Sequence, residues 1–479
     1  MIQLDLIVIV PFALAILAGL VGMIRPSAAK WVGLAVPLAQ GALLVSLARA
    51  GVFAGRTFGG SLSSDTSIWR LTVDGLAAPL LALTVVTGLL AIAASWRVDN
   101  RPGAHFALLA LLQGAVAGVF AADSLVLFYI AWECVLVPMF LLIAGWGSAG
   151  ARRASMKFLI FTFAGGAVLL VGVIATVVIA GTDSITAIAS MGGVPVYSTL
   201  VFWLLAIGFL VKVPAVPLHT WLPDAHTEAP TAGSIVLAGV LLKMGGYGLI
   251  RIALPFAPRA FDLAAPILAA LGLIGIVWGA ATALVQSDLK RLVAYSSVAH
   301  MGFVLLAISI ATPASLAAAV VTMVSHGLVA GLLFFLVGAL YGRAHTRELS
   351  AFGGLGSVTP RWAIAFVFAS LASAGLPGLS GFPGEFVTSI EAFSSVGWWT
   401  LVAGVGIVLA AAYNLRAVRS TVQGPVGGFE SLADLDALET ASVALMAVAI
   451  IAVGVAPWLL TDGATTAVSM VAQLVGRGV

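Results

Sequence analysis

Long apolar runs separated by short polar breaks make up most of this sequence. A helix needs roughly 20 apolar residues to cross the hydrocarbon layer of a membrane, because that layer is about 30 Å thick and each residue rises about 1.5 Å. Such runs occur about fourteen times without strand-like alternation, so helices are expected to satisfy the backbone hydrogen bonds. The expected helices are residues 4–23, 30–48, 73–95, 106–121, 124–145, 155–180, 199–218, 231–252, 263–285, 292–310, 315–340, 362–395, 398–416 and 440–460.

The composition agrees with a protein whose solvent is lipid. Of the 479 residues, 61% are hydrophobic and 9% are charged, whereas an ordinary soluble domain is about 25% charged. No linker is long enough to separate domains, so we predict an all-α polytopic membrane protein with a single membrane domain, 1–479. The N-terminal run lacks a charged leader and a small-residue cleavage site, and we expect it to remain as the first span. A weaker apolar stretch, 464–475, is short enough to lie on the membrane surface.

The charged and cysteine residues exclude several classes of function. The net charge is only +3 and forms no basic cluster, so no nucleic-acid partner is expected. The single cysteine, Cys134, excludes a disulfide framework, a thiolate zinc site and an iron–sulfur cluster held by this chain alone. Because Cys134 lies inside an apolar run, we expect it in the core. Asp74, at the start of the third expected helix, is expected to cap or pack that helix.

Lysine and arginine are distributed unevenly between the two sets of loops, and cytoplasmic loops carry the excess. The fourteen after odd-numbered helices are Arg25, Lys30, Arg97, Arg101, Arg152, Arg153, Lys157, Lys290, Arg291, Arg343, Arg347, Arg361, Arg416 and Arg419. The five after even-numbered helices are Arg49, Arg56, Arg70, Arg251 and Arg259. This bias predicts that both termini face away from the cytoplasm.

Two of the expected helices are interrupted by proline, which removes a backbone donor. The seventh has Pro214 and Pro217 after Lys212, and the twelfth has Pro377 and Pro383 before Glu385. The breaks are five helices apart, and an odd offset reverses the direction of crossing. The pattern therefore predicts two inverted five-helix repeats, helices 4–8 (106–252) and 9–13 (263–416), with helices 7 and 12 broken. Paired broken helices in inverted repeats indicate a transport site, although two unrelated kinks would give the same pattern.

Ionisable residues fall near the middle of several expected spans. They are Glu133, Lys212, Lys243, His300, His326 and Glu385. A central charge costs about 2.5–3.5 kcal/mol on insertion scales, so these groups must pair, become neutral or line water. Two plainer interpretations stay open: Glu133 and Lys212 could form a structural ion pair, and each histidine could be a satisfied hydrogen-bonding group.

A row of buried acid, lysine and histidine side chains is what a proton relay needs, because proton hopping requires groups that change charge, bridged by water. The sequence contains no glycine-rich phosphate loop with a lysine and no dinucleotide fingerprint. Moving one proton against about 150 mV costs roughly 3.5 kcal/mol. A partner is therefore expected to supply that energy.

Four long motifs resemble the antiporter-like subunits of the NADH-quinone oxidoreductase (complex I) family. They are KVPAVPLHTWLPDAHTEAPTAGSIVLAGVLLKMGGYGLIRI, QSDLKRLVAYSSVAHMGFV, YGRAHTRELSAFGGL and FYIAWECVLVPMFLLI. In that family the broken twelfth helix carries a lysine in subunits L and N and a glutamate in subunit M. Here the motif is GFPGEF with Glu385, and the chain ends after the expected fourteenth helix without the lateral arm of subunit L. The sequence therefore resembles the subunit M (subunit 4) family from about the third to the twelfth helix, although Pro383 departs from the family pattern.

The resemblance implies a role for each buried ionisable group in the first repeat. Glu133 and Lys212 resemble an ion pair whose opening and closing gates proton transfer. Lys243 resembles the central relay lysine. All three are among the ionisable residues expected near the middle of a span.

The histidines and the terminal acid also match family positions. His219, His300 and His326 resemble residues that pass protons along a hydrophilic axis together with water. Glu385 resembles the group that releases protons outward. His226 matches a position to which we assign a structural role.

The resemblance implies a proton-translocating membrane-arm subunit of a respiratory NADH:quinone oxidoreductase, a proton translocase in the inner (plasma) membrane of the cell. Its partners would be the other membrane-arm subunits, including related antiporter-like ones. NAD, FMN, iron–sulfur clusters and quinone are expected in partner subunits, with no catalytic residue, cofactor, metal or redox centre in this chain. One alternative is a cation/proton antiporter subunit, against which Glu385 argues; another is a membrane cytochrome with His300 and His326 as haem ligands.

Overall fold

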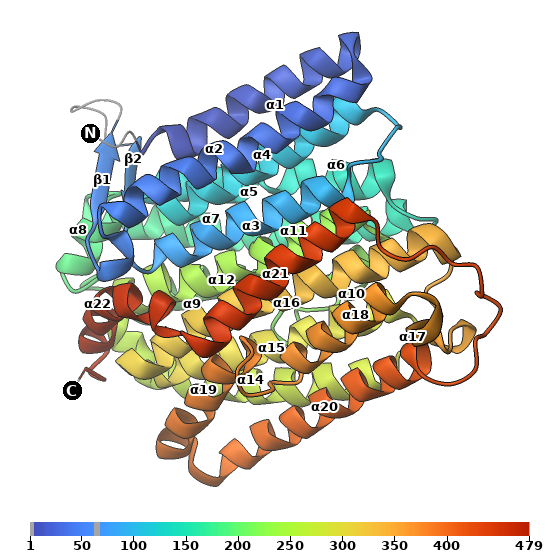
Figure 1. The fold of residues 1–479 in the computed structure, drawn as a ribbon. Helices are drawn as coiled ribbons and strands as arrows, with labels where there is room; N and C mark the ends of the chain where they lie inside the picture. The colour runs from blue at the N-terminus through green and yellow to red at the C-terminus, as the bar shows by residue number, and fades with distance from the viewer. Residues whose placement is uncertain (1–3, 62–67, 479) are drawn as a thin grey trace.

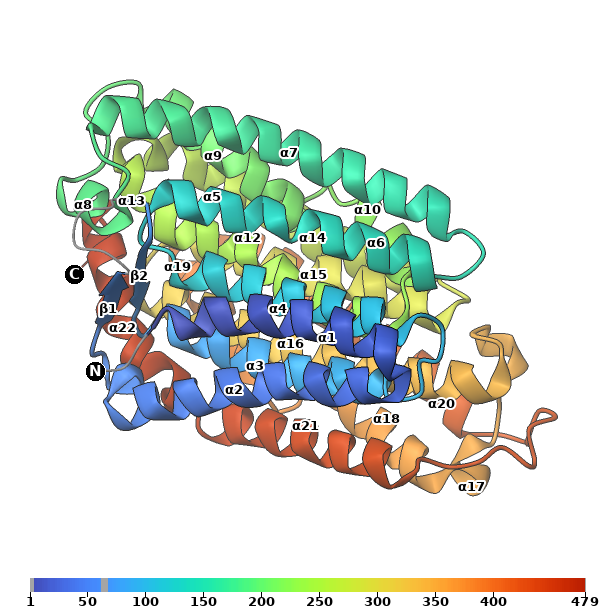
Figure 2. The same cartoon turned by 90° about the horizontal axis from the view of Figure 1, so that it is seen from above.

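The computed structural model describes residues 4–61 and 68–478, and nearly all of them are helical. The long helices lie side by side, and the end of the bundle that carries the hairpin is the one where α1 (Leu6–Ile24) begins, α21 (Ala437–Val455) ends and α22 (Trp458–Leu474) lies (Figures 1 and 2). Helix α1 therefore begins, and α22 ends, at the same end of the bundle.

The helices of the first half are α1 (Leu6–Ile24), α2 (Ala29–Arg49), α3 (Ala77–Ala94), α4 (Pro102–Ala121), α5 (Leu125–Cys134), α6 (Leu136–Trp146), α7 (Ala151–Ala180), α8 (Ile185–Ser190), α9 (Ser198–Lys212) and α10 (Trp221–Glu228). The helices that follow are α11 (Thr231–Val236), α12 (Leu242–Gly248), α13 (Leu254–Phe256), α14 (Phe261–Leu284), α15 (Leu289–Ile310) and α16 (Pro313–Ala344). The last are α17 (Leu355–Val358), α18 (Pro360–Ser373), α19 (Gly381–Val396), α20 (Thr400–Val422), α21 (Ala437–Val455) and α22 (Trp458–Leu474).

Each range in which the sequence predicts a span contains helix. Within the described residues, 12 helical stretches are long and apolar enough to cross a membrane, and Ser198–Lys212 is a shorter apolar helix. The multi-pass helical fold is thus confirmed, while the count of about fourteen crossings and the two inverted repeats stay predictions. The weak C-terminal stretch belongs to α22, which lies across the end of the bundle and packs against α16 (Figure 1).

A small hairpin, which the sequence did not predict, is added to the otherwise helical fold. Strand β1 (Phe58–Ser61) pairs antiparallel with β2 (Arg70–Val73), with Phe58 opposite Val73. Burial alternates along β2, which is the pattern of a strand with one covered face. The two strands lie in the connection between α2 and α3, where pairing satisfies backbone groups that no helix satisfies.

Both predicted helix breaks are present. Helix α9 ends at Lys212 and α10 begins at Trp221, whose indole Nε1 donates to the carbonyl of Val211 at 3.0 Å and satisfies a group that the break frees. Helix α18 ends at Ser373 and α19 begins at Gly381. The second break therefore contains Pro377, whereas Pro383 lies in the first turn of α19, where a missing backbone N–H leaves no bond unmade.

Helix α16 and its neighbours form the centre of the bundle. Of the candidate spans, Pro313–Ala344, Leu289–Ile310 and Thr231–Phe256 are the most completely buried. The last of these is one continuous helix, because two π-helical segments, Leu237–Leu241 and Leu249–Ala253, join α11, α12 and α13. These three spans carry Lys243 and the two mid-span histidines, so the fold places the candidate relay away from lipid.

Candidate proton-relay site

Lys243 and His326 are in direct contact at the centre of the bundle. Lys243 on α12 is fully buried, and its Nζ lies 2.5 Å from Nδ1 of His326 on α16. The same amine donates to the carbonyl oxygen of Ala238, in the π-helical segment that precedes α12. Amine and imidazole can each hold a proton, so this contact allows a proton to pass between two helices without an intervening water.

His300 and Glu385 form the second close pair. His300 Nδ1 on α15 lies 2.6 Å from Oε1 of Glu385 on α19, and both side chains are buried. The other ring nitrogen, Nε2, lies 3.3 Å from Oγ of Ser373 and 3.3 Å from the hydroxyl of Tyr413. Asn414 Nδ2 donates to Oγ of Ser373 at 3.2 Å and so fixes its position. The imidazole is therefore held by polar groups on both edges.

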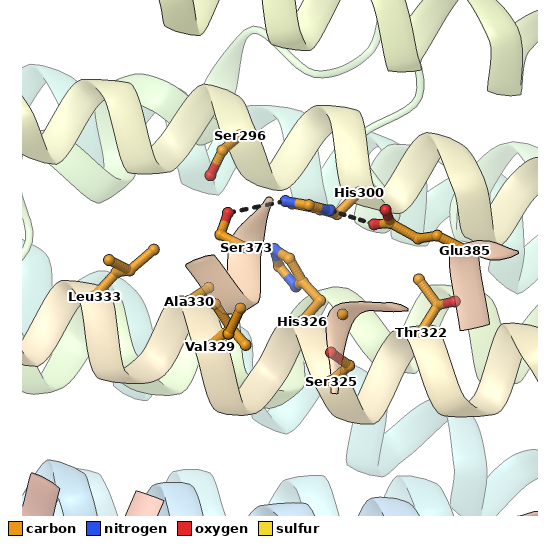
Figure 3. Close-up of a pocket in the computed structure, with 12 residues that line it drawn as sticks. Ser296, His300, Thr322, Ser325, His326, Val329, Ala330, Leu333, Ser373 and Glu385 are labelled. Atoms are coloured by element: carbon orange, nitrogen blue, oxygen red, sulfur yellow. Dashed lines mark hydrogen bonds and ion pairs between the residues drawn. The ribbon is translucent and has the colours of Figure 1, made fainter. Parts of the chain in front are cut away.

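A small cavity of about 10 Å³ lies between the two pairs. Figure 3 shows His300 on one wall, with dashed contacts to Ser373 and Glu385, and His326 on the facing helix. The rings of His300 and His326 are 5.7 Å apart between centroids, and Nε2 of His326 has no hydrogen-bond partner among the described residues. The cavity has about the volume that one water molecule needs. A water there would join the two pairs.

The four side chains thus form one row across four helices. In order, the row is Lys243 (α12), His326 (α16), His300 (α15) and Glu385 (α19). Oγ of Ser325, next to His326, donates to Oγ of Ser380 at 2.9 Å, which ties the broken segment before α19 to α16. The break lets the acid-bearing helix begin at the depth of the histidines. Chemically, the row can load, transfer and release a proton.

The structure places Glu133 and Lys212 near each other without the expected contact. Among the described residues, no ion pair within 4.0 Å joins the two side chains. Lys212 Nζ instead lies 4.8 Å from the ring centroid of Trp132, a cation–π contact. Glu133 turns toward α7, where a Cβ on Gly166 would come within 2.0 Å of its Oε1. Trp132, the residue before Glu133, thus occupies the position that faces the lysine.

His219 lies outside the row. It sits in the turn between α9 and α10, buried, with its ring 6.5 Å from that of Tyr295 between centroids. Its Nδ1 has no partner among the described residues. The structure therefore does not bring His219 into hydrogen-bond contact with the other predicted site residues.

Some polar groups around the row were missed by sequence reasoning. Ser373 and Tyr413 lie within hydrogen-bonding distance of His300, and Asn414 donates to Ser373; no charge or motif distinguishes these three residues in the sequence.

His226, to which a structural role was assigned, is fully buried on α10. Its ring stacks on that of Phe334 at 4.5 Å between centroids, and neither ring nitrogen has a partner within the described part of the chain.

Two of the basic residues counted as loop charges are held by partners inside the bundle. Lys290 is buried in α15 and donates to the carbonyl of Ala229. Arg251 pairs with Asp74 at 2.6 Å, and Asp74 also accepts from the backbone N–H of Ala77, which confirms its predicted capping role. Removing one charge from each set of loops leaves the direction of the loop bias unchanged.

Cys134 was expected in the core, but it is exposed at the end of α5.

Comparisons with known proteins match this arrangement of broken helices and buried charges. The family model for the transmembrane region of NADH:quinone oxidoreductase and Mrp antiporters matches residues 122–410. Subunit M of NADH-quinone oxidoreductase from Rhodobacter capsulatus is 40% identical over 82% of this chain and 80% of that protein. The subunit M of Pseudomonas aeruginosa is 42% identical over 85% of this chain and 82% of that protein. The chain belongs to the complex I subunit M family.

Solved structures support the same family and show how widely the fold occurs. A chain of respiratory complex I from Thermus thermophilus superposes with a TM-score of 0.89 at 29% identity and covers 99% of this chain and 100% of that chain. A chain of the Mrp complex from Dietzia has a TM-score of 0.87 at 21% identity over 98% of this chain and 97% of that one, which shows the fold alone. All seven predicted site residues of this subunit M family member lie inside the matched segment.

The described residues of this family member contain no group of three or more histidine, cysteine or acidic side chains that could hold a metal ion. Each histidine of the row contacts a charged side chain through Nδ1: His326 contacts Lys243, and His300 contacts Glu385.

Proposed function

We propose that this chain is a proton-translocating membrane-arm subunit of a respiratory NADH:quinone oxidoreductase. The observation that carries the proposal is the buried row from Lys243 through His326 and His300 to Glu385, which joins four helices by side chains able to change charge. Glu133 and Lys212 would control the proton on Lys243, and His219 would pass protons near the first break. Each of these roles rests on position and chemistry.

The energy for transport would come from other subunits of the complex. Relatives of this chain are named as subunits of NADH-quinone oxidoreductase, and its structural relatives are chains of multi-subunit complexes. We propose the other membrane-arm subunits, including related antiporter-like ones, as its partners. NAD, FMN, iron–sulfur clusters and quinone would be bound by those partners, and the complex would lie in the inner (plasma) membrane with both termini of this chain outside the cytoplasm.

The test uses the purified complex in sealed vesicles, with Glu385→Gln as the variant. Glutamine preserves the size of the side chain and can still accept from His300, but it cannot carry a proton. We expect electron transfer to quinone to lose its coupling to proton transport. Ser389→Ala is the matched control on the same helix, because the Ser389 hydroxyl donates only to the backbone of Glu385. Normal proton transport per electron in the assembled Glu385→Gln complex would refute the proposal.

The same vesicles separate protons from sodium. A cation/proton antiporter subunit would show transport that depends on the sodium concentration. We expect proton transport driven by quinone reduction to be the same in sodium-free and sodium-containing buffer.

A further inference from the structure

Trp132 is the side chain that lies against Lys212, in the place where an ion pair was expected. Both residues are buried: Trp132 is 2% exposed and Lys212 is 3% exposed. The ammonium lies 4.8 Å from the centroid of the indole ring. The face of an indole carries partial negative charge and attracts a cation most strongly where water is excluded. The ring therefore gives the lysine a partner that has no net charge and cannot take its proton.

Aromatic side chains from two helices hold this ring in place. The Trp132 ring stacks on Phe128 of α5 at 5.8 Å between centroids and meets Phe209 of α9 edge to face at 5.4 Å. The rings of Phe128 and Phe209 also contact each other, at 6.0 Å between centroids. Phe209 lies about one turn before Lys212 on the same helix. Trp132 is thus fixed within a packed cluster, whereas the carbon stem of Lys212 is flexible.

The backbone on both sides of Lys212 is closely packed against other helices. Before the lysine, a Cβ on Gly208 would meet the carbonyl oxygen of Gly165 on α7 at 2.8 Å. After it, the backbone nitrogen of Val213 lies where a Cβ on Gly245 of α12 would meet it at 2.9 Å. These close approaches leave the backbone little room to shift. A change of partner is therefore made by rotation of the lysine side chain.

Glu133 is the competing partner for the same ammonium. It directly follows Trp132, and successive residues of a helix point about 100° apart. Its carboxylate lies beside Gly166 of α7, where Oε1 is buried and has no hydrogen-bond partner among the described residues. A buried carboxylate oxygen without a partner gains from pairing with a cation. Two neighbouring residues of α5 therefore compete for Lys212, one through a ring face and one through a charge.

We propose that Trp132 is a positioning residue of the gate formed by Glu133 and Lys212: its ring holds the ammonium while the ion pair is open. The structure has this open arrangement. The strength of the cation–π contact then sets how often the pair is open, because the lysine must leave the ring to reach the carboxylate. The inference rests on the proposed control of proton transfer by this pair. An aliphatic side chain in place of the ring would leave the cation without a partner at membrane depth, where a lone charge is costly.

The experiment weakens the ring face without changing its size. Tryptophans that carry one, two, three or four ring fluorines are incorporated at position 132 alone, in the complete complex. Each fluorine withdraws electrons from the ring face and so weakens its attraction for a cation, while the packing volume changes little. The same series at Trp203 is the matched control, because Trp203 lies on α9, as Lys212 does, and its ring contacts Phe202.

Closing of the pair is measured with a membrane-soluble carbodiimide, which joins a carboxylate to an amine as an amide when the two are in contact. Mass spectrometry gives the initial rate at which the amide between Glu133 and Lys212 forms. We expect this rate to rise with each fluorine at position 132, by up to about 30-fold over the series, which corresponds to the loss of a desolvated cation–π contact. The rate of proton transport should fall in the same order, and the Trp203 series should change neither rate.

Two results would overturn the proposal. If the rate of amide formation does not change with fluorination, the ring only packs against the lysine stem. If amide formation rises while proton transport is unchanged, the ring holds the lysine but takes no part in gating. Amide formation requires no proton transport, so the first measurement stands apart from the proposed function, which Glu385→Gln tests separately.

Discussion

Nζ of Lys243 and Nδ1 of His326 lie 2.5 Å apart, although the two residues are 83 positions apart in the chain. The contact joins the helix that carries the central lysine of the first predicted repeat to α16, in the second. It is the only point in the described row where two proton-carrying groups from the two predicted repeats touch directly. A proton held in the first repeat can therefore reach the cavity beside His300 and Glu385.

Replacing Lys243 tests this link. Lys243→Met keeps most of the buried volume and removes the amine, so folding should survive because an expensive buried polar group is lost. We expect coupled proton transfer to fall by about a hundredfold, as when a positioned proton carrier is removed. The measurement is proton transport per electron in assembled complex. Lys30→Met serves as control, because Lys30 lies over the ring of Trp96 far from the row, and full transport in Lys243→Met would contradict the assignment.

The second prediction concerns Glu133 and Lys212, which are not in contact in this structure. If they form a switch, another conformation must bring them together, and transport needs both states. Were the pair only structural, removing one partner would destabilise the protein by about 3–5 kcal/mol and removing both would restore it together with activity.

We therefore expect Glu133→Gln combined with Lys212→Met to assemble better than either single variant and to remain defective in proton transport. Assembly level and proton transport in all three variants give the answer. Normal transport in the double variant would leave a structural pair as the correct interpretation.

Gly166 offers an independent way to disturb Glu133 without changing its charge. A Cβ at this position would lie 2.0 Å from Oε1 of Glu133, so Gly166→Ala must displace the carboxylate. We expect this overpacking to lower the free energy of unfolding by roughly 1–3 kcal/mol and to slow the proposed gating step. Thermal unfolding and steady-state proton transport measure the two effects. Gly19→Ala on α1, where an added Cβ meets nothing within 4 Å, should change neither.

The loop charges predict the orientation of the chain, and a fusion experiment can test this prediction. Both termini are expected outside the cytoplasm, so a reporter that is active only in the cytoplasm should be inactive when fused after residue 479. The same reporter inserted in the connection between α6 and α7, beside Arg152 and Arg153, should be active. The reverse pattern would invert the predicted topology, and two active or two inactive fusions would show that the predicted number of crossings is wrong.

The sequence by itself determined the helices, the two breaks and the position of each ionisable residue along its helix. Length, apolar composition and proline act within one segment, and a residue's height in the membrane depends only on its distance from the end of its helix. For this reason the interruptions after Lys212 and before Glu385 were predicted at the right places. The Asp74 cap is local in the same way, because it involves residues three positions apart.

Tertiary structure decided which of these groups meet. Depth does not fix the direction in which a side chain leaves its helix, and that direction depends on how distant helices pack. Lys243 therefore met His326, and Trp132 took the place beside Lys212 that Glu133 was expected to fill. Cys134 faces outward for the same reason. The packing of α22 across the end of α16 and the close approach of α19 to α16 at Gly384 were not predicted either, because both are contacts between segments that no local pattern connects.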